Sequence, residues 1–251
     1  MVRRALAGGI SFLLMVGWAF GGTPFGGDDG GFIPPNAPTK RCEEGFLGAA
    51  KFTARCVMKC HTKAATFALR ARPFDEETCE QTCLIKFMAR ANRLVTEGGC
   101  PPCLDTTGQV AIGNAIEDFV DDLSGDVYCA PGTPFGGDDP GNVPADKDMA
   151  RCQSRVHSNL GHLVTCLRLA HLKAARQAFR GDAFDDESLE QDCRAKYDDG
   201  TLTILAHAGC PPCLDAAAQG DLATGTEQFA DESLASIYCA SPSGAFLADG
   251  V

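Results

Sequence analysis

The chain has 251 residues, 45% of them hydrophobic, so a packed core in one large domain or two ordinary ones is within reach. Its formal net charge of −11 argues against nucleic acid or an anionic membrane as a partner, because both repel an acidic surface. The 14 cysteines are an unusually large and even-numbered set, which predicts a framework of disulfides.

The first residues have the pattern of a secretory signal peptide. Arg3 and Arg4 precede an uncharged apolar run over 5–20, and Ala19 begins a small-x-small cleavage site. The run is short for a membrane span. We therefore expect a secreted or periplasmic protein, with no membrane insertion after cleavage, in a compartment where disulfides persist.

The remaining chain is a duplication with a spacing of 110 residues. The octapeptide over 22–29 recurs unchanged over 132–139, and about 40 of the 110 aligned positions are identical without a gap. Linkers rich in Gly, Pro and Asp cannot bury enough apolar surface to fold, so we expect them to be mobile. The predicted organisation is a signal peptide (1–21), a linker (22–37), helical repeat one (38–131), a second linker (132–147), helical repeat two (148–241) and a C-terminal tail (242–251).

Both repeats carry helix signals, and no stretch shows sustained period-two alternation. A first helix is expected over 39–70, ahead of Pro73, and a second begins after Asp75, whose carboxylate can cap it. A third helix is expected to be broken near Gly113 and, in repeat two, near Gly225. The predicted fold is all-α, with two tandem disulfide-stapled helical domains, each an antiparallel helical hairpin plus a broken third helix.

The cysteine spacing predicts how the hairpin of repeat one is stapled. A spacing of four places both cysteines of each helix on one face, and an antiparallel register that joins Cys60 to Cys79 also joins Cys56 to Cys83. All 14 cysteines are predicted to form disulfides: Cys42, Cys56, Cys60, Cys79, Cys83, Cys100, Cys103, Cys129, Cys152, Cys166, Cys193, Cys210, Cys213 and Cys239.

Repeat two supports this register. It has Ala170 and Leu189 at the positions of the inner two hairpin cysteines, as the loss of one whole disulfide requires, and it keeps Cys166 and Cys193. These two are therefore predicted to bond to each other.

The other cysteines of repeat one leave a choice open. Cys42 lies on the same helix face, so we expect it to bond to Cys100 or Cys103, with Cys129 taking the other one. The spacing does not decide between the two. The same choice exists in repeat two for Cys152, Cys210, Cys213 and Cys239.

Two cysteine motifs also invite a chemical interpretation. Cys56-x-x-x-Cys60-His61 resembles a variant c-type haem attachment site, but a haem gives no reason for the inner two cysteines to disappear together in repeat two. Cys100-Pro-Pro-Cys103 resembles the redox pair of thioredoxin-like proteins, but the βαβ context is missing. Zinc held by the two distant Cys-Pro-Pro-Cys corners is weaker still. Structural disulfides are the favoured interpretation, with no cofactor.

The remaining candidates are histidines and acidic residues. His61 recurs as His171, and across the hairpin we expect His61 near Glu77 or Glu80, and His171 near the equivalent Glu187 or Glu190, in structural rather than catalytic roles. Asp138, Asp139, Asp146 and Asp148 of the second linker could gather calcium, but they lack the spacing of a calcium loop, so a solubilising spacer is favoured. No catalytic, cofactor-binding or metal-binding residue is predicted.

The motifs resemble two groups of proteins. The facing Cys-x-x-x-Cys pairs resemble the α-hairpinin pattern of small plant defence peptides, over the hairpin alone. Lys59-Cys60-His61, Phe74-Asp75-Glu76-Glu77 and Gly99-Cys100-Pro101-Pro102-Cys103 resemble uncharacterised exported cysteine-rich helical repeat proteins of environmental bacteria, over both repeats. That second resemblance implies a fold and no activity.

The expected function is that of an exported, non-enzymatic binding or structural protein, with an extracellular or periplasmic protein as the expected kind of partner. No G-x-S-x-G, H-E-x-x-H or P-loop motif is present. Two alternatives stay open: a thiol-disulfide redox protein that uses the Cys-Pro-Pro-Cys corners, and a hairpin-type protease inhibitor.

Overall fold

The computed structural model describes residues 31–136, 139–182, 186–207 and 209–240, so the predicted signal peptide and tail lie outside the described residues. The described part is almost entirely helical, which confirms the all-α prediction. No helix in it has both the length and the apolar character of a membrane span. The elements are α1 (Ala37–Ala68), α2 (Glu76–Glu97), α3 (Thr106–Val127), β1 (Pro134–Gly136), β2 (Asp139–Asn142), α4 (Lys147–Arg180), α5 (Asp186–His207) and α6 (Ala216–Ile237), with 3₁₀ turns over Pro102–Leu104 and Pro212–Leu214.

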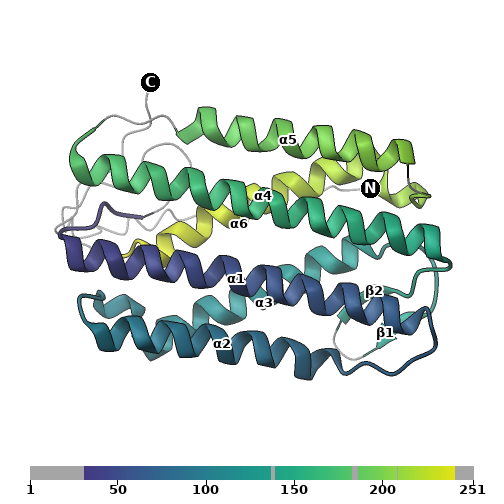
Figure 1. Cartoon of the computed structure of the whole chain (residues 1–251), viewed down its shortest axis with the longest axis horizontal. Coiled ribbons are helices and arrows are strands. Elements are labelled where there is room, and N and C mark those ends of the chain that lie inside the picture. The colour runs from purple at the N-terminus through teal and green to yellow at the C-terminus, as the bar shows by residue number, and fades with distance from the viewer. Residues whose placement is uncertain (1–30, 137–138, 183–185, 208, 241–251) are drawn as a thin grey trace, which may run out of the picture.

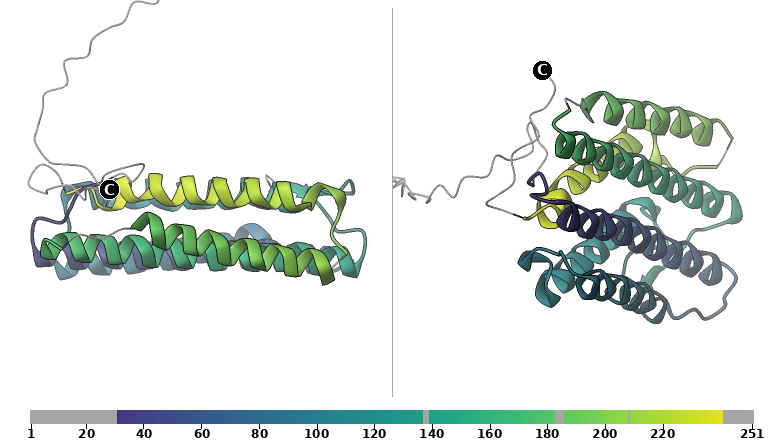
Figure 2. Two further views of the ribbon diagram at one scale, coloured as in Figure 1. Left: turned by 90° about the horizontal axis from the view of Figure 1, so that it is seen from above. Right: turned by 60° about the vertical axis from the view of Figure 1, so that its left-hand side comes forward.

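The helices form two layers. Figure 1 shows α2, α1, α4 and α5 side by side in one layer, with α1 and α4 antiparallel at its centre. Helices α3 and α6 form the second layer, which Figure 2 shows from its edge. Repeat one supplies α1, α2 and α3, and repeat two supplies α4, α5 and α6, so the two copies meet along α1 and α4.

Side-chain caps explain where the helices begin. The backbone N–H of Thr78 donates to the carboxylate of Asp75 at 3.0 Å, as the sequence predicts for the start of α2. The equivalent cap at Asp185 lies outside the described residues. Asp146 caps α4, since its carboxylate accepts from the N–H of Asp148 and of Met149. This linker aspartate therefore has a structural role.

Both third helices run without interruption, which corrects the expected break. Helix α3 continues through Gly113, where a Cβ atom would lie 3.4 Å from the ring of Phe87 on α2. The small residue thus permits a close approach of α2 and α3 rather than ending a helix. Gly225 lies within α6, which is likewise continuous.

The linkers are ordered where the structure describes them, which corrects the expectation of mobile spacers. Strands β1 and β2 pair antiparallel, and the ring of Phe135 packs edge-on against Tyr128 at the end of α3, with 5.1 Å between centroids. In the first linker, the N–H of Phe32 donates to the carbonyl of Tyr238 at 2.7 Å. The described part of each linker therefore packs against the end of a third helix.

The two repeats share one hydrophobic core. Buried side chains of both repeats, including Phe46 and Leu160, belong to a single cluster. In the second layer the rings of Phe119 and Phe229 stack with 4.0 Å between centroids. The duplicated halves therefore form one body, with sites available at their junction.

Candidate functional site

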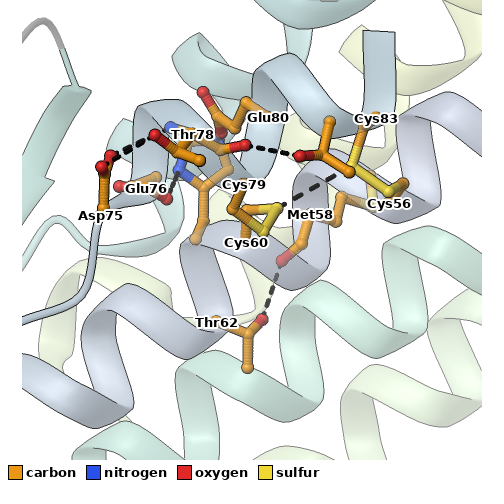
Figure 3. The surroundings of a disulfide bond; sticks show 12 residues. Cys56, Met58, Cys60, Thr62, Asp75, Glu76, Thr78, Cys79, Glu80 and Cys83 are labelled. Atoms are coloured by element: carbon orange, nitrogen blue, oxygen red, sulfur yellow. Dashed lines mark hydrogen bonds and ion pairs between the residues drawn. A yellow bond between two sulfur atoms is a disulfide. The ribbon is translucent and has the colours of Figure 1, made fainter. Parts of the chain in front are cut away.

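The hairpin cysteines are bonded in the register that the sequence predicts. Cys56–Cys83 and Cys60–Cys79 each have 5.8 Å between Cα atoms, and Figure 3 shows them one helical turn apart, close to Glu76 and Glu80. In repeat two, Cys166–Cys193 occupies the position of the outer staple. Each hairpin is therefore fixed by at least one disulfide.

The first cysteine of each corner closes its own repeat. Cys42 bonds to Cys100 and Cys152 bonds to Cys210, which selects one of the two partners that spacing left open. Both bonds tie the start of the repeat's first helix to the turn before its third helix.

The second cysteine of each Cys-Pro-Pro-Cys corner does not bond within its own repeat, whereas the sequence predicted that it would. Cys129 bonds to Cys213 and Cys103 bonds to Cys239, so these two disulfides join the repeats instead of closing each one. Helices α3 and α6 lie next to each other in the second layer, which brings the end of each to the corner of the other repeat (Figure 2).

This pairing removes the basis of the redox alternative. Neither Cys-Pro-Pro-Cys corner forms an internal disulfide, because its two cysteines bond to different partners. The described residues contain all 14 cysteines and none is free. Cys60 is bonded to Cys79, which also leaves no thiol for a haem.

His61, on α1, is buried among three carboxylates from two other helices, Glu76 and Glu80 on α2 and the half-buried Asp121 on α3. Its Nδ1 lies 2.7 Å from Glu76 Oε1, and its Nε2 lies 3.0 Å from both Glu80 Oε1 and Asp121 Oδ1. The sequence predicted Glu80 as a neighbour and did not predict Glu76 or Asp121. Burial by itself lowers the pKa of His61, but hydrogen bonds to Asp121 and Glu76 and the nearby carboxylate charges raise it to about 10.

Repeat two builds the same group at the equivalent positions. His171 Nε2 hydrogen-bonds to Glu190 Oε1 and lies 3.4 Å from Asp231 Oδ1. Asp186, the counterpart of Glu76, is also buried. Because α1 and α4 are antiparallel and each histidine lies in the last third of its helix, the two groups lie toward opposite ends of the molecule (Figure 1).

A separate, mainly apolar cavity lies where the repeats meet. It has a volume of about 540 Å³, within the range of small-molecule sites, and α1, α3, α4 and α6 all contribute to its walls. Small and apolar side chains line most of it, including Ala50, Ala54, Ile112, Ala230 and Ile237.

A basic cleft adjoins this cavity. Lys51 and Arg168 line both hollows. The cleft is lined by Gly48, Lys51, Phe52, Arg55, Cys56, Lys59, Arg90 and Arg168, of which five are cationic and none is acidic. A concentration of positive charge in a chain of net charge −11 is a local arrangement that the overall composition conceals.

The cations at the junction of the two hollows repel one another. Burial lowers the pKa of Lys51, and the charges of Arg168 and Arg55 lower it further. Burial also lowers the pKa of Arg168, whose Nε is buried without a hydrogen-bond partner. A bound anion would relieve both effects.

The duplication supplies an internal comparison for the cavity. At the equivalent place on the other side of the molecule is a smaller hollow of about 360 Å³, whose rim carries Asp122, Asp126 and Asp221. There the fully buried Leu160 stands at the position of Ala50, and Val120 stands at that of Ala230. Larger side chains therefore fill one junction where small ones leave the other open.

The basic cleft also occurs in one copy only. Arg168 corresponds to Met58 in repeat one, and the four cleft cations of repeat one correspond to uncharged residues in repeat two. Lys51, Arg55, Lys59 and Arg90 are replaced there by Gly161, Thr165, Leu169 and Gly200.

The sequence did not predict the cavity or the cleft, although the alignment of the two repeats contains a signal for both. Small residues of one repeat are aligned with large residues of the other, and cationic residues are aligned with uncharged ones. Comparisons with family models, with curated proteins and with solved structures find no match to this chain.

Proposed function

We propose that the chain is an exported binding protein for a small amphipathic anion, such as a long-chain carboxylate. The apolar tail of this ligand occupies the cavity between the repeats, and the anionic head group of the ligand lies in the basic cleft. The observation that carries this proposal is that Lys51 and Arg168 line both hollows.

The cavity provides for the tail. Burial of an alkyl chain against apolar walls is favourable by about 25 cal/mol per Å² of apolar surface removed from water. The walls come from four helices that two inter-repeat disulfides join, so the cavity is largely preformed and little ordering is needed on binding.

The cleft provides for the head. A guanidinium matches a carboxylate or phosphate in a bidentate geometry, and a partly desolvated charge-assisted hydrogen bond is stronger than one in water. Arg168 Nε has an unused donor at this point. Seven disulfides and a predicted signal peptide agree with an exported location.

Competition with a fluorescent fatty acid tests the head group. On the disulfide-intact chain, we expect myristate to displace the probe at micromolar concentration and Arg168→Met to weaken myristate about tenfold or more, as for the loss of a charged hydrogen bond. This variant copies Met58 of repeat one. Tetradecanol, which has no charge, should bind both proteins alike. The matched control is Arg151→Met, on the same helix but with Arg151 exposed and paired to Asp148.

A second pair of variants tests the tail. Ala50→Leu copies Leu160 and should weaken myristate and tetradecanol together, because it fills the cavity. Ala235→Leu makes the same change at an exposed position of α6 and should leave both affinities unchanged. No displacement by myristate, or equal losses in the variants and their controls, would contradict the proposed function. The hairpin-inhibitor alternative stays a prediction.

A further inference from the structure

Each repeat brings one histidine and two carboxylates together from three helices. The groups are His61, Glu80 and Asp121 in repeat one and His171, Glu190 and Asp231 in repeat two. Within each group, one ligand atom of every residue lies within 4.8 Å of the others. Neither group belongs to the basic cleft, and only His171 also borders the apolar cavity.

The environment of His61 is that of a metal-ligating histidine. Such a histidine commonly donates its other ring N–H to a carboxylate, which fixes the tautomer and the ring orientation. Glu76 Oε1 lies 2.7 Å from Nδ1, on the side of the ring away from the two ligand carboxylates. Nε2 is thereby directed at Glu80 and Asp121, at 3.0 Å from each.

The duplication gives a second instance of the group. Fewer than half of the aligned positions are identical, yet the histidine and both carboxylates of the group are kept in repeat two. The neighbouring inner staple is not kept, because Ala170 and Leu189 replace its cysteines. The carboxylate that faces Nδ1 is represented there by Asp186, which is also buried.

We propose that each group binds one divalent transition-metal ion, such as Zn²⁺, through the histidine Nε2 and the two carboxylates. Imidazole with carboxylates suits zinc and related ions, whereas Ca²⁺ and Mg²⁺ prefer oxygen ligands alone. Metal binding displaces the Nε2 proton to solvent, and the resulting neutral imidazole and two carboxylates balance the charge of one divalent ion. Three protein ligands leave a coordination position for water or a small ligand.

The scaffold holds these ligands in place. Cys60 and Cys79, which bond to each other, directly precede His61 and Glu80 in the chain. The disulfide therefore restricts the separation of two of the three ligands in the group of repeat one, whereas repeat two has Ala170 and Leu189 at these positions.

Metal content after dialysis against Zn²⁺ tests the proposal on the tag-free, disulfide-intact chain. We expect two ions per chain, one after either Asp121→Asn or Asp231→Asn, and none in the double variant. Asp122→Asn, at the exposed neighbouring position, should still bind two. Fewer than two ions in the wild-type chain, or two retained in the double variant, would overturn the proposal.

A spectroscopic measurement on the unaltered chain does not depend on any variant folding. In imidazole ¹⁵N spectra, Zn²⁺ should shift Nε2 of His61 and of His171 and leave the exposed His207 unchanged. If neither histidine shifts at saturating Zn²⁺, the groups are ion-pair networks only and the proposal is wrong. Ca²⁺ at the same concentration should shift neither.

Discussion

The two junctions between the repeats are built from equivalent helices but differ in the size of their cavity and in the charge of the residues around it. On one side Ala50, Ala230 and Ser233 leave a cavity of about 540 Å³, which meets a cleft of five cations. On the other side larger residues, Leu160 among them, reduce the hollow to about 360 Å³, and aspartates line its rim. A duplicated scaffold has thus one junction that is suited to packing and one that is suited to a ligand.

In this duplicated fold, features that recur in both repeats are separated from features that occur once. The histidine groups, the caps of α3 and α6, and the disulfides other than Cys60–Cys79 recur in both repeats, so they belong to the common scaffold. The cavity and the cleft occur once. A binding site for a single ligand is expected at positions where the side chains of the two repeats differ.

The largest expected effect concerns Glu43, which is fully buried where repeat two has Gln153. Burial raises the pKa of Glu43 to about 8, and a backbone hydrogen bond at Ala240 opposes this only in part. Because the folded pKa exceeds the unfolded one, the protonated carboxyl stabilises the fold fully below pH 4.5, and this contribution is lost as the pH rises through about 8. Wild-type chain should therefore lose roughly 4 kcal/mol of unfolding free energy over this range.

Urea unfolding at pH 5 and pH 9 measures this effect. Glu43→Gln should remove most of the loss and be the more stable protein at pH 9. The neighbouring Glu44 is the matched control. Burial raises the pKa of Glu44, but Arg176 and Lys40 lower it by more, so the net shift is downward. Glu44→Gln should therefore not gain stability at pH 9. If the stability of Glu43→Gln depends on pH as strongly as that of the wild-type chain, ionisation of Glu43 is not the cause of the loss and the prediction is wrong.

The next effect tests whether the second junction is truly filled. Leu160→Ala should lower the unfolding free energy by about 3 kcal/mol, since it removes a fully buried side chain and leaves a void. Leu169→Ala, at a position that is 43% exposed, should change it by less than about 0.5 kcal/mol. Equal costs at the two positions would show that the comparison of packed and open junctions is wrong.

A smaller effect concerns the inner staple of repeat one. The double substitution Cys60→Ala and Cys79→Leu copies repeat two and should cost about 2 kcal/mol, because Cys56–Cys83 already restricts the unfolded hairpin. Guanidinium unfolding of the oxidised protein measures it. A chain that no longer folds would show that repeat one depends on a bond that repeat two does without.

The smallest effect separates the charged cleft from the apolar cavity. Raising the ionic strength from about 0.05 M to about 0.5 M should weaken myristate a few-fold, because salt screens the cleft cations. Tetradecanol should bind equally well or better. Weaker binding of both ligands to a similar extent would place the head group outside the cleft.

The sequence predicted what depends on local spacing. The facing Cys-x-x-x-Cys motifs and the loss of one pair in repeat two gave the register of Cys60–Cys79 and Cys56–Cys83, and Asp75 marked the start of α2. These features follow from helix geometry within one hairpin, which a single stretch of sequence contains.

What the sequence did not predict depends on the position of the third helices. Asp121 reaches His61, and Cys129 reaches Cys213, because α3 and α6 pack behind the hairpins in a common second layer. Spacing within one repeat carries no information on that arrangement. The cavity is a difference in side-chain volume between aligned positions, so it becomes visible only when the repeats are compared residue by residue.

The proposed function places an amphipathic anion at one junction and not at both. Native mass spectrometry of the disulfide-intact chain with excess myristate tests this placement. One bound myristate per chain is expected, with none in the double variant Ala50→Leu, Arg168→Met. Two bound molecules, none, or one that is still bound by this double variant would contradict this placement.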